Sequence, residues 1–120
     1  MFKFQGQHFI VSYVNCVGLN NLVELKNVFE KAIISSNAMI LSSTDYTFSN
    51  NGYTAIYLLS ESHASIHTYP EHKSCFVDLF TCGDHCNYEN FHNIMKEYLQ
   101  PETSYNKLIL REEKNKIIHN

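Results

Sequence analysis

Only 2 of the 120 residues are proline, only 4 are glycine, and charged residues make up just 18% of the chain. Disordered chains are richer in charge and collagen-like chains are far richer in glycine and proline, so both classes are excluded. The 44% of hydrophobic residues is instead typical of a globular protein. Because 120 residues can build one domain with a real core but not two, we expect residues 1–120 to form a single domain.

The sequence also lacks long hydrophobic runs and an excess of positive charge. No apolar run approaches the roughly 20 residues that a bilayer-spanning helix needs, and the N-terminal residues have no apolar stretch that would make a secretory signal. Nine Lys and Arg against 12 Asp and Glu give a net charge of −3. Since nucleic-acid binding relies on neutralising phosphates, this balance argues against it. We expect a cytoplasmic protein with no membrane and no nucleic-acid partner.

The chain has four cysteines: Cys16, Cys75, Cys82 and Cys86. In a reducing compartment they are core residues, metal ligands or catalysts. Cys82 and Cys86 enclose His85, a spacing that suggests zinc. A closed zinc site needs four ligands, usually from two such clusters, and the sequence has no second cluster. We therefore predict no metal site.

Hydrophobic periodicity predicts two helices and six strands. Apolar residues at helical spacing cover 22–33, with Asn21 and Glu24 at capping-box-like spacing, and 88–99, ahead of Pro101. Strands are predicted at 8–16, 38–48, 53–59, 64–69, 75–80 and 108–110, with tight turns at 60–63 and 70–73. Consecutive hairpins flanked by helices indicate an α+β fold: a mainly antiparallel sheet with two helices packed on one face, a two-layer sandwich.

One face of that sheet is predicted to lack a cover. Strand 53–59 has apolar residues on both faces, so a homodimer is expected, although helices placed otherwise within one chain would also cover the face.

In strand 64–69, alternation puts Ser65, His67 and Tyr69 on one face. Taken alone, His67 has the pattern of a structural histidine and Cys82 that of a buried cysteine. The remaining histidines considered are expected on loops or helix surfaces, without a role: His63, His72, His85, His92 and His119.

Three blocks of sequence follow one another at a specific spacing: LSESH at 59–63, IHTYPE at 66–71 and DLFTCG at 78–83. With Gly6-Gln-His8 ahead of the first strand, they closely resemble the bacterial and archaeal S-adenosylmethionine decarboxylase proenzymes, over residues 6–112. Members of that family are small pyruvoyl-dependent enzymes of polyamine synthesis. The resemblance implies a decarboxylase that makes the aminopropyl donor for spermidine synthesis.

The resemblance further implies that the Glu61–Ser62 bond cleaves itself, giving a β chain of 1–61 and an α chain of 62–120. Ser62 would attack the Glu61 carbonyl and end as a pyruvoyl group at the new N-terminus, because its hydroxyl is first nucleophile and then leaving group. His67, nearby on the following strand, would assist this processing. The hydroxyl of Thr54 would assist as well, at a position where many relatives have serine.

For decarboxylation, the resemblance implies a Schiff base between the pyruvoyl group and the substrate amine. Cys82 would donate the proton that replaces CO2. Phe48 and Tyr69 would stack around the adenine, although many relatives have Trp where Tyr69 stands. Glu71 would hydrogen-bond the ribose hydroxyls.

Two alternatives remain open from the sequence. A pyruvoyl-dependent decarboxylase of another amino acid, such as ornithine or arginine, would keep the processing residues and lose the adenosine contacts. An inactive homologue serving as a regulatory partner would lose the processing residues.

Overall fold

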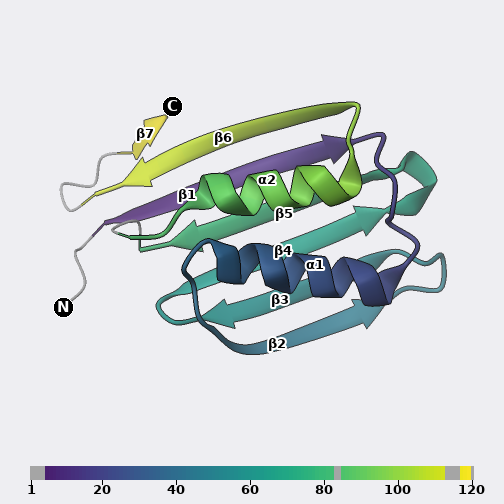
Figure 1. Ribbon diagram of the computed structural model, residues 1–120, viewed down its shortest axis with the longest axis horizontal. Helices are drawn as coiled ribbons and strands as arrows, with labels where there is room; N and C mark the ends of the chain where they lie inside the picture. Colours follow the sequence, from purple (N-terminus) through teal and green to yellow (C-terminus); the bar gives the residue numbers. More distant parts are fainter. Residues whose placement is uncertain (1–4, 83–84, 113–116, 120) are drawn as a thin grey trace.

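The computed structural model describes residues 5–82, 85–112 and 117–119, and these build one antiparallel sheet covered on one face by two helices (Figure 1). The sheet has seven strands in the order β2-β3-β4-β5-β1-β6-β7. The predicted α+β sandwich is therefore confirmed. The strands are β1 (Gly6–Val14), β2 (Ile40–Thr47), β3 (Tyr53–Leu59), β4 (Ser62–Tyr69), β5 (Ser74–Thr81), β6 (Thr103–Arg111) and β7 (Ile117–His119); the helices are α1 (Leu22–Ser35) and α2 (Tyr88–Leu99), with a short 3-10 turn η1 (Pro70–His72).

Strands β2 to β5 follow one another as hairpins, and β1 then pairs with β5 on one side and β6 on the other. Phe9 of β1 lies opposite Leu79 of β5 and Leu108 of β6, and all three side chains are buried. Because residues directly opposite each other share a face, this row belongs to the core between the sheet and the helices.

Both helices lie over the same face of the sheet (Figure 1). Each begins at an asparagine whose side-chain oxygen accepts a backbone N–H of the first turn: Asn21 from Glu24 at 3.2 Å, and Asn87 from Asn90 at 3.1 Å. Such caps satisfy N–H groups that have no partner within the helix. The helices bury one apolar stripe each, formed by Leu25, Phe29, Ala32 and Ile33 of α1 and by Phe91, Met95 and Leu99 of α2.

The other face of the sheet is open in the single chain. It carries large apolar side chains that are at least one-third exposed, a pattern typical of a face that has a partner. These side chains are Ile10, Tyr46, Ile56, Leu58, Phe76 and Tyr105. Among the described residues, no helix is long and apolar enough to cross a membrane.

Several predicted boundaries are wrong. β4 begins at Ser62, so the turn before it contains only Ser60 and Glu61. β6 extends back to Thr103, because pairing with β1 continues to Val14 and the backbone ladder holds even the polar residues of β6 in extended form. The polar stretch hid this part of the strand from a search for alternating apolar residues. β7 was not predicted.

Two of the histidines assigned to loops or helix surfaces, His63 and His119, lie in strands, and a third, His92, is on a helix but half-buried. His63 is part of β4. His92 is half-buried on α2, where its Nδ1 and the Tyr13 hydroxyl share a hydrogen bond of 2.7 Å. His119 belongs to β7. Cys16 and Cys75 are buried in the core, one of the roles left open for them.

Candidate active site

The turn between β3 and β4 has two residues and an unusual backbone. Leu59 pairs with Ser62, so Ser60 and Glu61 alone connect the strands. Glu61 has φ of 62°, in the left-handed region, where two-residue hairpin turns favour glycine or asparagine. A side chain such as glutamate costs roughly 1–2 kcal/mol there. The Glu61–Ser62 bond therefore lies at a strained point of the hairpin.

Ser62 is the first residue of β4, only 8% exposed, on the face that the helices cover. Its neighbour strand β5 ends close by: His63 pairs with Phe80, so continuing the register by one residue sets Ser62 opposite Thr81. Cys82 is the next residue in the chain. Ser62 and Cys82, predicted to act together, thus meet at the same end of the sheet.

Cys82 belongs to a cluster with two further potential metal ligands. The sulfur atoms of Cys82 and Cys86 and a ring nitrogen of His85 all lie within 4.8 Å of one another. Both cysteines are half-buried, and His85 is exposed. Burial raises the pKa of the Cys86 thiol, and the neighbouring Cys82 raises it further.

His67 and Thr54 form a second pair, which lies on the open face. They are directly opposite each other on β4 and β3. Thr54 Oγ1 and His67 Nδ1 share a hydrogen bond of 3.1 Å. This bond fixes the ring orientation and leaves Nε2 available for proton transfer.

A cavity of about 690 Å³ adjoins this pair. Its volume is within the range of small-molecule sites. It brings together all three residues predicted to bind substrate with both of the assisting residues, Thr54 and His67. Its lining comprises Phe48, Ser49, Asn50, Gly52, Thr54, His67, Thr68, Tyr69 and Glu71.

The two aromatic side chains at this cavity are half-exposed, and each packs against another aromatic ring. Phe48 is 50% exposed and packs edge-on against Tyr46, with ring centroids 4.8 Å apart. Tyr69 is 40% exposed and packs against Phe76 at 5.2 Å. Each ring therefore keeps a surface free for a ligand while its position is held.

Backbone hydrogen bonds join the two segments that carry these rings. Phe48 N donates to Gly52 O at 2.7 Å, which closes the turn after β2. Tyr53 N then donates to Thr68 Oγ1 at 2.9 Å, which ties the start of β3 to the end of β4 beside Tyr69. The cavity wall is a fixed part of the sheet end and not an independent loop.

The predicted residues therefore form two groups that are separate within one chain. Ser62 and His67 are five residues apart on one strand, which is about 16 Å at the ordinary rise per residue, and an odd spacing sets them on opposite faces. The expectation that His67 lies near the Glu61–Ser62 bond is wrong for the single chain. Cys82 and Ser62 are at one end of β4, and the cavity is at the other.

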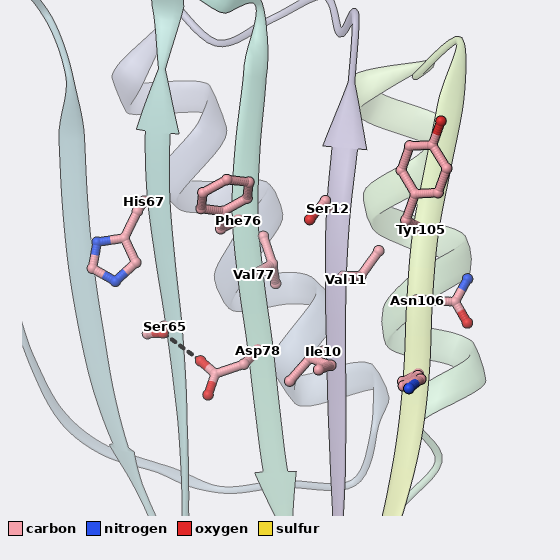
Figure 2. A pocket seen from close by; sticks show the side chains of 11 residues that line it. Ile10, Val11, Ser12, Ser65, His67, Phe76, Val77, Asp78, Tyr105 and Asn106 are labelled. Carbon is pink, nitrogen blue, oxygen red and sulfur yellow. Dashed lines mark hydrogen bonds between the residues drawn. The ribbon is translucent and has the colours of Figure 1, made fainter. Parts of the chain in front are cut away.

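A further polar cluster on the open face was not identified from the sequence. Asp78 accepts hydrogen bonds from Ser65 and from His8 Nε2, the latter at 2.8 Å. Burial opposes ionisation of Asp78, but these two hydrogen bonds hold the pKa of its carboxyl below the usual value. Figure 2 shows Ser65 and Asp78 beside a cavity of about 460 Å³ that extends across β4, β5, β1 and β6 and that His67 also lines. The sequence signal that could have identified this cluster is the alternation of side chains along β1, β4 and β5, which sets His8, Ser65 and Asp78 on one face of the sheet.

Comparisons with known proteins agree on one family. The family model described as S-adenosylmethionine decarboxylase matches residues 7–112. The S-adenosylmethionine decarboxylase proenzymes of Methanococcus aeolicus and Thermomicrobium roseum are each 35% identical to the chain over 101 residues. Those matches cover 82% and 83% of this chain and 86% and 87% of the respective relatives.

Solved structures show the same fold. The crystal structure of the adenosylmethionine decarboxylase from Aquifex aeolicus is similar with a TM-score of 0.77 and 28% identity, covering 88% of this chain and 89% of that one. A monomer structure titled AdoMetDC-delta26, from Trypanosoma brucei, has a TM-score of 0.54 at 13% identity, covering 88% of this chain and 45% of its own. The second likeness concerns the fold alone.

Proposed function

The chain belongs to the S-adenosylmethionine decarboxylase family, and from this premise we propose that it removes CO2 from S-adenosylmethionine after cutting its own backbone between Glu61 and Ser62. The cut would yield a β chain of 1–61 and an α chain of 62–120. The product is the aminopropyl donor used in spermidine synthesis. The relatives are named proenzymes, which is consistent with a precursor that matures by cleavage.

The observation that carries the substrate assignment is the composition of the 690 Å³ cavity. Phe48 and Tyr69 offer aromatic faces for a purine and for a sulfonium cation, which favours such faces. Glu71, which also lines the cavity, supplies a carboxylate that can accept hydrogen bonds from both hydroxyls of a ribose. Ornithine and arginine could place their cations on the aromatic faces, but they have no purine to stack there and no ribose hydroxyls for Glu71 to bind.

The strained turn supports the self-cleavage. Ser62 Oγ would attack the carbonyl carbon of Glu61; the new C–O bond forms as the C–N bond breaks, and the freed amine takes up the hydroxyl proton. Removal of the Cα proton of residue 62 would then expel the Glu61 carboxylate. Hydrolysis of the remaining enamine would release ammonia and leave the pyruvoyl group. A left-handed Glu61 relieves its backbone strain when this bond is cut.

The residues around position 62 fit a pyruvoyl group. Residue 62 is nearly buried at the end of β4, and the register brings Cys82 to the same end. When present, the group would supply an electron sink for the pair of electrons that CO2 leaves behind. Cys82 Sγ would hold the proton that is delivered to the substrate Cα. Phe48, Tyr69 and Glu71 would hold the adenosine and so fix where that carbon lies.

A homodimer would unite the two groups of residues. Within one chain, His67 and the adenosine cavity are about 16 Å from Ser62 along β4. The open face that carries His67 and Thr54 is also the face with exposed apolar side chains, among them Ile56 and Phe76. Two copies packed through this face in a two-fold dimer would give two equivalent sites. Each would take the exposed turn at Glu61 and the Glu61–Ser62 bond at the start of β4, together with Cys82, from one copy and Thr54, His67 and the cavity from the other.

Two measurements on the purified protein test this function. Intact mass should show two fragments, each close to half of 14.0 kDa, with the second beginning at a blocked residue 62. Release of CO2 should be rapid with S-adenosylmethionine and slight with ornithine or arginine. A preference for either amino acid would identify the alternative decarboxylase. A chain that stays uncut on long incubation would identify the inactive homologue.

A further inference from the structure

Cys82, His85 and Cys86 bring three metal-binding atoms together between the end of β5 and the start of α2. These atoms lie within 4.8 Å of one another. Zinc–sulfur and zinc–nitrogen bonds of about 2.3 and 2.0 Å place tetrahedral ligands somewhat under 4 Å apart. A shift of an ångström or less in the side chains would therefore bring all three onto one ion.

The segment that carries two of these ligands is anchored to the end of α1. Asn37 Nδ2 donates to His85 O at 3.1 Å, and Asn87 N donates to Ser36 O at 2.9 Å. One turn later, Asn90 Nδ2 donates to an α1 carbonyl, that of Ser35, at 3.2 Å. The backbone on either side of Cys86 is thus fixed before any ion binds, which lowers the ordering cost of binding.

Three ligands are too few for a closed structural zinc site, which is why the sequence predicted none. They are, however, the number used by open sites, where the fourth position holds water or another small ligand, and two cysteines with one histidine is a known set for zinc. We propose that Cys82, His85 and Cys86 form an open site for a thiophilic divalent cation, of which Zn²⁺ is the representative. Soft thiolates favour Zn²⁺ over Mg²⁺ or Ca²⁺, which prefer oxygen.

Such a site would switch off the enzyme reversibly. This consequence rests on the proposed function, in which Cys82 donates the proton to the substrate. Metal binding requires the thiolate, so the proton of Cys82 is released to solvent. The lone pair of the Cys82 sulfur that would carry this proton is then bonded to the ion. The cation would therefore remove the proton donor without touching the adenosine cavity or residue 62.

A second cluster of potential ligands provides an internal control. His8, His63 and Asp78 also have ligand atoms within 4.8 Å of one another, but both Asp78 oxygens already accept hydrogen bonds from His8 and Ser65. This cluster contains no sulfur. An ion bound there would give no thiolate-to-metal charge-transfer absorption.

The binding test is a Co²⁺ titration of the purified, chelator-treated protein, followed by Zn²⁺ competition. We expect a thiolate-to-cobalt charge-transfer band that saturates at about one equivalent and disappears on addition of Zn²⁺. His85→Ala and Cys86→Ser should each weaken binding at least about 10-fold, since loss of a residue that merely hydrogen-bonds a ligand already costs about 10- to 100-fold. His63→Ala should leave the band unchanged. Absence of the band, or wild-type affinity in both site variants, overturns the proposal.

The activity test uses the processed enzyme and Zn²⁺. Decarboxylation by the wild type should fall in proportion to the occupancy found spectroscopically and return on chelation, whereas Cys86→Ser should need at least about 10-fold more Zn²⁺. Binding at one equivalent with undiminished turnover overturns the inhibitory role of the site. If S-adenosylmethionine is not decarboxylated at all, the proposed function fails, and the cobalt spectra still decide whether the metal site exists.

Discussion

Self-cleavage should be restored when Ser62→Ala and His67→Ala chains are expressed together, although neither variant cuts itself alone. The expectation follows from distance: the two residues are about 16 Å apart along β4, which is too far for His67 to act on its own Glu61–Ser62 bond. In a mixed dimer, one site combines the intact Ser62 of the His67→Ala chain with the intact His67 of its partner. The other site lacks both.

The pairing of the two variant chains determines which chain is cut and what fraction of it is cut. Random pairing makes about half of all dimers mixed, so about half of the His67→Ala chains should be cut, and no Ser62→Ala chain should be. Intact mass analysis after co-expression distinguishes the two chains by their substitutions. The two chains are co-expressed so that mixed dimers can form as the chains fold.

The matched control carries both substitutions in one chain, co-expressed with the wild type. In mixed dimers the intact Ser62 now faces a partner without His67, so about half of the wild-type chains should remain uncut. If the site lies within a single chain, the two experiments give the opposite pattern: no cutting in the first and full cutting of wild-type chains in the second. That pattern would refute the composite site.

The remaining predictions concern substrate binding, proton delivery, processing rate and stability. Phe48→Ala should raise KM about 5- to 30-fold with little change in kcat, because the half-exposed ring supplies roughly 1–2 kcal/mol of binding; steady-state CO2 release measures both. Cys82→Ala should still be cut to a useful extent but should decarboxylate at least about 100-fold more slowly, the usual worth of a positioned acid; fragment mass and CO2 release separate the two effects. Thr54→Ser should be cut at least as fast as the wild type, because it keeps the hydroxyl that bonds His67 at 3.1 Å, whereas Thr54→Val should be cut more slowly; the time course of fragment appearance decides. Burial lowers the pKa of His92 to about 4 from its usual 6.5, so between these pH values the unfolded chain binds more protons than the folded chain. The free energy of unfolding should therefore fall as pH drops from 6.5 to 4, with about 1–2 kcal/mol of the fall due to His92, given the solvent screening of a half-buried group. Denaturant titrations should show a smaller fall for His92→Gln than for the wild type, because carboxyls with lowered pKa such as Asp78 still contribute.

The elements that the sequence predicted well are those whose local pattern and tertiary role agree. β3 and α2 match their predicted ranges, because Tyr53–Leu59 alternates between two faces and Tyr88–Leu99 presents one apolar stripe. The N-terminal half of β6 was missed for the opposite reason. Its residues are held extended by pairing with β1, a contact between segments about 90 residues apart that no local pattern encodes.

For the candidate site, the sequence indicated the residues but not their grouping. The five-residue interval between Ser62 and His67 already requires opposite faces once both lie in one strand, yet placing Ser62 in the turn concealed this. The structure ends the turn at Glu61, and the parity of the strand then separates the cleavage bond from the histidine that would assist it. An enzyme whose cleavage depends on a partner's histidine stays inert as a free chain. Dimerisation and maturation would therefore be a single event, because the same face that needs covering carries the group that permits the cut.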